Sequence, residues 1–195
     1  MHLPAVCKAR PAWQPPIYYA LFFFAASVGG WIWEVGVLWI DHWGRYSLWE
    51  LIAGYRGFLH GPWAPIYGVG AVLMVLLSVK AGRRPGRFFA VCMAVCGVLE
   101  YVTSWALEQL FHARWWDYTG YFLNINGRIC AMSLLVFAAA GLLVAYLLAP
   151  LFWRGMDRLP RRAVRLAAAV LAALFAADLI LSIAAPNLGL GVTLA

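Results

Sequence analysis

The sequence has few charged residues, and acidic residues are especially scarce. Asp, Glu, Lys and Arg make up 12% of its 195 residues, with 8 Asp or Glu, whereas 65% of the residues are hydrophobic. A soluble domain of this size could not bury so much apolar surface. The composition therefore excludes a soluble globular protein and indicates a membrane protein.

Several sequence motifs of catalysis are absent. The chain contains no GxxxxGK[ST] phosphate loop, no HExxH zinc motif and no GxSxG nucleophile motif. It cannot drive transport with ATP by itself, and we expect no cofactor and no metal. Enzymatic activity is less well supported by the sequence than a non-enzymatic role.

Cysteine is also scarce, and its positions predict no disulfide. Cys7 lies near the N-terminus, Cys92 and Cys96 lie within one apolar stretch, and Cys130 lies at the far end of another, so no oxidised pair is evident. Cys92 and Cys96 share one helix face at i and i+4, a spacing that could hold a soft metal. Packing by small residues between helices is the better-supported interpretation.

Long apolar runs, by contrast, are abundant. A helix needs about 20 mostly apolar residues to cross the hydrocarbon core. Because the runs are continuous rather than alternating, they predict helices and not the strands of a barrel. Five stretches qualify: Ile17 to Ile40, Pro62 to Val79, Phe88 to Phe111, Ile129 to Phe152 and Ala163 to Ala185.

Lys and Arg are distributed unevenly between these stretches. Two precede the first stretch and four lie between the second and third. Five lie between the end of the fourth stretch and the first turn of the fifth, which contains Arg165; the alternate segments hold two, two and none. The positive-inside rule places the basic segments in the cytoplasm. We therefore predict an all-α polytopic bundle of five transmembrane helices, with residues 1–16 as a cytoplasmic N-terminal segment, residues 17–195 as one membrane domain, and the C-terminus outside. The net charge of +7 is explained by the Lys and Arg residues of the cytoplasmic segments, so it does not indicate nucleic-acid binding.

Two outer loops are rich in local signals. Ser47 and Glu50 have the spacing of a capping box, which predicts a short helix that ends at Gly54 and lies along the outer membrane surface. Pro62 is predicted to begin the second long helix, because a first-turn proline needs no amide donor. The second loop, 112–128, ends in the turn sequence NINGR.

Ionisable side chains within the apolar stretches are the first candidates for function, because they are expensive at membrane depth. Glu100, Ser104 and Glu108 share one face of the third stretch, and Glu34 lies in the first. Asp178 lies in the fifth, with no evident partner in the sequence. An ion-pair network that only fixes helix register is an equally supported interpretation of Glu34, Glu100, Arg56 and Arg128.

Arg128 lies at the N-terminal end of the fourth stretch, where the helix dipole repels a cation. It therefore needs a carboxylate such as Glu108, Glu100 or Asp117, or else it awaits an anionic ligand. Arg56 occupies a comparable position before the second stretch. Arg56 and Arg128 would lie at the mouths of two helices, above Glu34, Glu100 and Glu108. This arrangement predicts a polar cavity that opens outward.

Four segments resemble the putative ABC-transporter type IV family, the CmpB-like membrane proteins of bacteria. The matching segments are GWIWE at 30–34, RGFLHGPWAPIYGVGA at 56–71, LEYVTSWALEQLF at 99–111 and WWDYTGYFLNINGRIC at 115–130. The resemblance implies a permease component in the bacterial inner membrane, with lipids around it and a separate cytoplasmic ATPase or a second copy of the chain as partner. It also adds Tyr118 and Asn124 to the candidate positions.

The leading hypothesis is a transport subunit that binds an anionic or zwitterionic solute in the outward cavity. Two alternatives remain open: an intramembrane enzyme acting on lipid or lipid-linked substrates, with a Glu or His as base, and a structural or sensor membrane protein. The candidate substrate-binding residues are Glu34, Arg56, Glu100, Ser104, Glu108, Asp117, Tyr118, Asn124 and Arg128.

Overall fold

A computed structural model describes residues 14–54, 57–81, 84–189 and 192–194 of the chain. Within these residues, four helices are long and apolar enough to cross a membrane, and a shorter apolar helix covers Pro65–Val79. The long ones are α1 (Pro16–Asp41), α4 (Pro85–Phe111), the continuous helix Ala131–Met156, and α7 (Arg161–Ala184). The structure fits the predicted helical membrane bundle.

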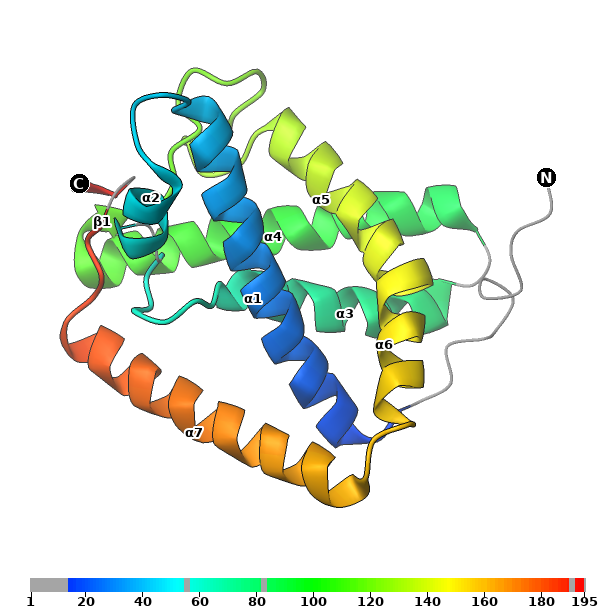
Figure 1. Ribbon diagram of the computed structural model, residues 1–195. Helices are drawn as coiled ribbons and strands as arrows, with labels where there is room; N and C mark the ends of the chain where they lie inside the picture. Colours follow the sequence, from blue (N-terminus) through cyan, green and yellow to red (C-terminus); the bar gives the residue numbers. More distant parts are fainter. Residues whose placement is uncertain (1–13, 55–56, 82–83, 190–191, 195) are drawn as a thin grey trace.

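The helices form two layers that cross each other (Figure 1). Helix α3 (Pro65–Ala81) runs beside α4, and α1 and the helix Ala131–Met156 cross in front of this pair. Helix α1 packs on α3 and α4 packs on α5, whereas α7 packs against α1. Residues of α1, α3, α4 and α5 line a space that lies between α1 and α5.

Glycines allow the close approach of α1 and α3. A Cβ atom added to Gly68 would lie 2.2 Å from Ser27 Oγ and 2.7 Å from the backbone oxygen of Phe23. In the same way, Gly30 faces the ring of Tyr67. Small residues at such contacts let the backbones approach, which is how membrane helices gain packing energy. Gly68 and the buried Ala71 thus give α3 a face of small residues.

The helix Ala131–Met156 contains a π-helical turn. It consists of α5 (Ala131–Leu143), the π-helical turn Val144–Leu148, and α6 (Ala149–Met156). Pro150 lacks an amide proton and its ring would clash with the carbonyl four residues earlier. The amide of Ala149 instead bonds to Val144 O, five residues back. The wider turn thus accommodates the proline without interrupting the span.

The short helix predicted after α1 is present, together with its capping box. Helix α2 (Leu48–Gly54) begins with the capping box, because the Ser47 amide donates to Glu50 Oε2 at 2.7 Å and the Glu50 amide donates to Ser47 Oγ at 3.2 Å. These backbone and hydroxyl hydrogen bonds lower the pKa of Glu50. The carboxylate therefore remains charged while it caps the helix.

Two sequence-based expectations need correction. Helix α3 begins at Pro65 rather than Pro62, because residues 61–64 are held in a non-helical path by bonds to other helices. The fold also contains one small antiparallel pairing, of β1 (Ala113–Arg114) with β2 (Thr193–Leu194). It joins the loop after α4 to the end of the chain, and strands of two residues leave no recognisable pattern in the sequence.

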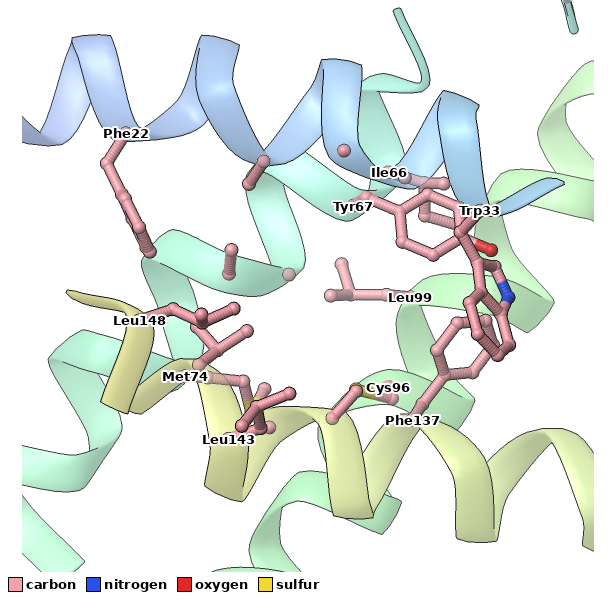
Figure 2. A pocket seen from close by; sticks show the side chains of 18 of the residues that line it. Phe22, Trp33, Ile66, Tyr67, Met74, Cys96, Leu99, Phe137, Leu143 and Leu148 are labelled. Carbon is pink, nitrogen blue, oxygen red and sulfur yellow. The ribbon is translucent and has the colours of Figure 1, made fainter. Parts of the chain in front are cut away.

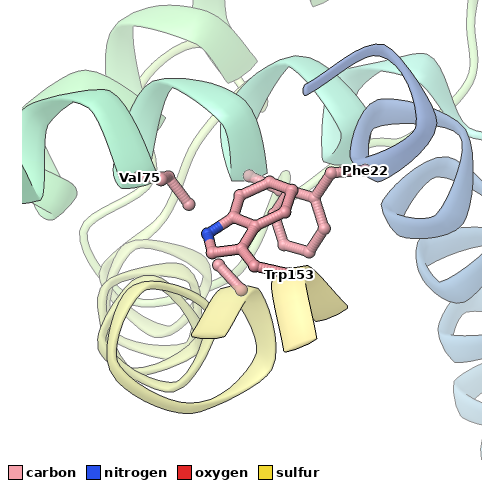
Figure 3. Packing of buried hydrophobic residues seen from close by; sticks show 5 residues of the cluster. Phe22, Val75 and Trp153 are labelled. Atoms are coloured by element: carbon pink, nitrogen blue, oxygen red, sulfur yellow. The ribbon is translucent and has the colours of Figure 1, made fainter. Parts of the chain in front are cut away.

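One core cluster of the fold combines aromatic and aliphatic side chains. Phe22 and Val75 pack against Trp153, with the Phe22 and Trp153 ring centroids 5.1 Å apart (Figure 3). This cluster joins α1, α3 and α6 at the end where the basic loop between α6 and α7 lies. Such aromatic pairs add about 0.5 to 1.5 kcal/mol beyond their buried area. The cluster fixes the positions of the three helices that border the space beside α1.

Candidate functional site

A cavity of about 610 Å³ lies between α1, α3, α4 and the helix Ala131–Met156 (Figure 2). Its volume is within the usual range for sites that bind small molecules. Its lining is mostly aliphatic and aromatic, with Phe22, Met74 and Leu148 at one end and Trp33, Tyr67 and Phe137 at the other. The cavity is therefore apolar, in contrast to the polar one that the sequence predicts.

Glu100 is the ionisable carboxyl group in the lining of this cavity. Its side chain is buried, and its two oxygens accept from different elements: the Tyr118 hydroxyl at 2.8 Å and the Ser133 hydroxyl at 3.1 Å. A carboxylate offers about four acceptor positions. Two hydroxyl donors therefore hold Glu100 in place and leave capacity for a further donor.

Local structure explains why these two donors face Glu100. Cys130 caps α5, with Ser133 N–H donating to its Sγ at 3.4 Å and its own amide donating to Ser133 Oγ at 3.2 Å. This reciprocal pair fixes the Ser133 hydroxyl beside α4. Burial, followed by the charge of Glu100, raises the pKa of Tyr118. The phenol therefore stays protonated and acts as a donor.

A second acid lies close to Glu100. Glu34 of α1 accepts a hydrogen bond from the Tyr67 hydroxyl, and its charge interacts with that of Glu100. Tyr67 itself lines the cavity and packs edge-on against Phe137, with ring centroids 5.7 Å apart. Two carboxyl groups and an aromatic pair therefore gather at one end of an otherwise apolar space.

A separate ionic cluster lies near the C-terminal end of α4. Glu108 pairs with Arg128 at 2.5 Å through one oxygen and with Arg114 at 2.9 Å through the other. The buried Arg128 also donates to Ser104 at 3.3 Å, and its guanidinium lies 5.7 Å from the ring centroid of Tyr101. Of the partners that the sequence leaves open for Arg128, which are Glu108, Glu100, Asp117 or an anionic ligand, the structure shows Glu108.

This cluster holds Arg128 away from the cavity. Arg128 and Glu108 are not among the described residues that line it. The structure therefore brings an acid and a guanidinium together as predicted, but beside the cavity rather than inside it. Arg56, the other predicted cation, lies outside the described residues.

The remaining predicted site residues shape the loop 112–130. Asp117 accepts from the Thr119 hydroxyl at 2.6 Å and from the Thr119 amide at 2.8 Å, and these bonds lower the pKa of Asp117. Asn124 Oδ1 accepts from the amide of Gly127, whose φ of +66° suits glycine. Asp117 and Asn124 thus stabilise turns, and Asp117 does not contact Arg128 in the described structure.

Asp178 in α7 forms a second polar cluster, with partners that the sequence did not reveal. Its carboxylate accepts from the amides of His60 and Gly61, at 3.1 and 2.8 Å, and from Trp63 Nε1 at 2.8 Å. Ser182 also donates to it at 3.3 Å. The carboxylate therefore holds the segment before α3 against α7.

His60, Ser182 and Asp178 do not form a catalytic triad. In a triad the histidine uses one ring nitrogen for the serine and the other for the carboxylate. Here His60 Nδ1 lies 3.0 Å from Ser182 Oγ and 3.8 Å from Asp178 Oδ1, so the same nitrogen faces both groups. Ser182 is also fully buried, so its hydroxyl is inaccessible to a substrate.

Cys92 has the packing role that its helix spacing favours. It is fully buried, and a Cβ atom added to Gly141 of α5 would lie 2.8 Å from its Sγ. No group of three or more His, Cys, Asp or Glu side chains with metal-binding geometry occurs in the part of the chain that the structure describes. The interpretation of Cys92 and Cys96 as a metal site gains no support.

Comparison with known proteins agrees with the predicted family. The family model described as Putative ABC-transporter type IV matches residues 21–183. The chain belongs to this family. Searches of the curated proteins and of the solved structures found no match.

The match to the ABC-transporter type IV family covers the cavity, the Glu108–Arg128 cluster and the Asp178 carboxylate. It begins within α1 and ends within α7, so Glu34, Glu100, Glu108, Arg128 and Asp178 all fall inside it. Together with the apolar helices, it identifies the chain as a multi-pass membrane protein of a transport-related family. The resemblance seen in the four sequence segments is thus confirmed.

Proposed function

We propose that the chain is the membrane-embedded, substrate-binding subunit of a transport system, and that the cavity beside α1 is its substrate site. The observation that carries this proposal is the placement of Glu100. A buried carboxyl group lines an apolar space of about 610 Å³ and is fixed there by Tyr118 and Ser133. An ionisable group at membrane depth is a candidate for substrate or ion contact.

The proposed arrangement has five spans, with the N-terminus in the cytoplasm and the C-terminus outside. Helix α3 has 17 residues and is about 25 Å long at 1.5 Å per residue, so it spans the hydrocarbon core only together with the segment 61–64. Arg154 at the end of α6, Arg158 in the loop and Arg161 at the start of α7 support the orientation. A bacterial inner membrane is the compartment that fits these features.

Labelling of introduced cysteines tests the orientation. In a chain whose native cysteines are replaced by serine, a cysteine at the exposed Tyr121 should react with a membrane-impermeant maleimide added to intact cells. A cysteine at the exposed Arg158 should react only after the membrane is opened. The reverse pattern would contradict the proposed topology.

The energy for transport must come from outside the chain or from protons. Because the sequence lacks a phosphate loop, ATP hydrolysis would require a separate cytoplasmic ATPase subunit. Alternatively, a proton could be taken up and released at Glu34 or Glu100. Either source of energy is compatible with the cavity as the substrate site.

The described residues favour a different ligand from the anionic solute that the sequence suggests. Arg128 is already paired with Glu108, and among the described lining residues Glu100 is the one that carries a carboxyl group. A carboxyl group attracts a cation or a hydrogen-bond donor. We therefore assign substrate contact to Glu100 and a structural role to the Arg128 cluster.

Replacing Glu100 with glutamine tests the transport role in cells. If the chain transports, Glu100→Gln should change the pools of accumulated solutes measured by untargeted mass spectrometry, while the lipid profile stays constant. Glu50→Gln is the matched control, because it makes the same chemical change in the short outer helix α2. A changed lipid profile with unchanged solute pools would contradict the proposal and indicate an enzyme, and loss of folded protein would indicate a structural network.

A further inference from the structure

We propose that an anionic phospholipid binds at the end of the fold where α1, α6 and α7 meet. One acyl chain lies in a crevice between α1 and α7, and the phosphate lies among the arginines around the turn between α6 and α7. This site is separate from the cavity beside α1, so the inference goes beyond the proposed function. Two observations carry it: an apolar crevice and a cluster of uncompensated positive charge in the same segment of the chain.

The crevice, which we call the α7 crevice, has a volume of about 460 Å³. It is lined by Leu21 and Val28 of α1, Met156 of α6, and Ala163 and Leu171 of α7, among others, and all the described residues of its lining are apolar. Ala163 is exposed, so the crevice is open on the side of α7. In a membrane this opening faces lipid tails.

The α7 crevice has about the depth of one membrane leaflet. Between Ala163 and Leu171, helix α7 rises about 12 Å at 1.5 Å per residue, and between Leu21 and Val28 helix α1 rises about 10 Å. Half of the hydrocarbon core of a bilayer is about 15 Å thick. An acyl chain of the leaflet on the side of the turn therefore fits along the crevice.

Positive charge is concentrated around the turn between α6 and α7. Asp157 is the one acid in the segment 154–165, and it accepts a hydrogen bond from the Tyr18 hydroxyl at 3.1 Å. The segment contains five arginines, all of them exposed, and none forms an ion pair with a residue that the structure describes. These arginines, which we call the arginine cluster, are Arg154, Arg158, Arg161, Arg162 and Arg165.

The chain does not supply an anion for the arginine cluster from its other basic segments. Residues 1–16 and 80–87 are basic and contain no Asp or Glu. In the proposed topology these segments lie on the same side of the membrane as the cluster. The compensating charge must therefore come from outside the chain.

The arginine cluster and the α7 crevice share one short segment. Leu159 and Ala163 line the crevice and directly follow Arg158 and Arg162 in the sequence. The bond between Tyr18 and Asp157 holds this segment beside the start of α1 (Figure 1). Arginine side chains reach the headgroup level while the apolar surface beside them stays among the tails. Guanidinium groups also bind phosphate through paired hydrogen bonds.

Other occupants match only one of the two features. A zwitterionic phospholipid fills the crevice but brings no net negative charge, and a free phosphate ion leaves the crevice empty. A second copy of the chain, docked by the same face, would place its own arginines against the cluster, where like charges repel. An anionic phospholipid complements both the charge and the apolar lining.

Binding of two lipids with identical chains tests the inference. Purified full-length protein in detergent is titrated with dioleoyl phosphatidylglycerol or dioleoyl phosphatidylcholine, and the complex with one lipid is quantified by native mass spectrometry. The anionic lipid should bind at least tenfold more tightly. Glycerol 3-phosphate, which has the phosphate but no chains, should not displace it.

Two matched pairs of variants locate the site. Arg158→Gln with Arg161→Gln should weaken phosphatidylglycerol binding at least tenfold, whereas Arg84→Gln with Arg87→Gln removes the same charge beside α4 and should leave it unchanged. Both pairs replace exposed arginines. Ala167→Phe adds a ring in the crevice and should weaken binding similarly, whereas Ala169→Phe adds it at an exposed position of α7 outside the lining.

Equal affinities for the two lipids would overturn the inference, and this comparison uses the unchanged chain, so it does not depend on how any variant folds. Displacement by glycerol 3-phosphate would also overturn it and would indicate a site for free phosphate. So would equal effects of the two arginine pairs, or of Ala167→Phe and Ala169→Phe. None of these variants alters Glu100, so failure here would leave the proposed substrate cavity standing.

Discussion

Replacing Gly68 with alanine is expected to destabilise the protein by about 1 to 3 kcal/mol, the usual cost of overpacking. The new methyl group would lie 2.2 Å from Ser27 Oγ and 2.7 Å from the carbonyl oxygen of Phe23. The serine side chain could rotate, but the backbone carbonyl can move only if α1 and α3 separate. The midpoint of thermal unfolding in detergent should therefore fall clearly.

Gly70 provides a matched control two residues away in α3. A Cβ atom added there meets nothing within 4 Å. Gly70→Ala should raise the unfolding midpoint or leave it unchanged, because alanine in a helix is favoured over glycine by roughly 0.5 to 1 kcal/mol. Equal unfolding midpoints for the Gly68 and Gly70 variants would show that α1 and α3 do not approach as closely as described.

Replacing Glu108 with glutamine is expected to have the second large effect, a clear fall in the free energy of unfolding, because it leaves a buried arginine without its carboxylate. Arg128 has a side chain that is 8% exposed, and its ion pair with Glu108 would be lost. The smaller Arg114→Gln change should cost up to about 1 kcal/mol, since Arg114 is more exposed and Glu108 still pairs with Arg128.

The double variant Glu108→Gln with Arg128→Met separates the ion pair from general damage. It removes the uncompensated charge, so it should recover much of the stability that the single variant loses. Chemical unfolding of the variants in mild detergent provides the measurement. If Arg114→Gln proves as damaging as Glu108→Gln, Arg128 does not depend on Glu108 in the way described.

Signals within short stretches of sequence predicted the long apolar helices and the short helix α2. The Ser47 to Glu50 capping box acts through residues three positions apart, so its effect is readable directly from the sequence. The start of α3 was predicted too early, at Pro62. Pro62 and Pro65 would both suit the first turn of a helix. The helix begins at Pro65 because residues 60, 61 and 63 are bonded to Asp178, more than 100 positions away.

The polar clusters were only partly predictable. Glu100, Ser104 and Glu108 share a helix face, and this spacing indicated that they would act together with Arg128. The spacing could not show which carboxylate would form the ion pair with Arg128. In the structure Glu108 forms it, whereas Glu100 accepts hydrogen bonds from Tyr118 and Ser133. These pairings depend on the capping box of α5, which places the Ser133 hydroxyl, and on the turn at Gly127, which places Tyr118 and Arg128 along α4.

The apolar cavity could not be predicted from the sequence. It exists because α1 packs on α3, α5 packs on α4, and small residues such as Ala25, Gly29 and Ala140 leave the space between α1 and α5 unfilled. The sequence shows these residues only as ordinary members of apolar helices. Their common position appears only when the two helix layers are placed against each other.

The central claim is that Glu100 faces an apolar, ligand-accessible cavity. The most direct measurement is reaction with dicyclohexylcarbodiimide, an apolar reagent that adds to protonated carboxyl groups, followed by mass spectrometry of the labelled peptides at mildly acidic pH. We predict modification of Glu100 and much less modification of Glu108, which two arginines hold. An unmodified Glu100, or equal modification of Glu100 and Glu108, would contradict the account.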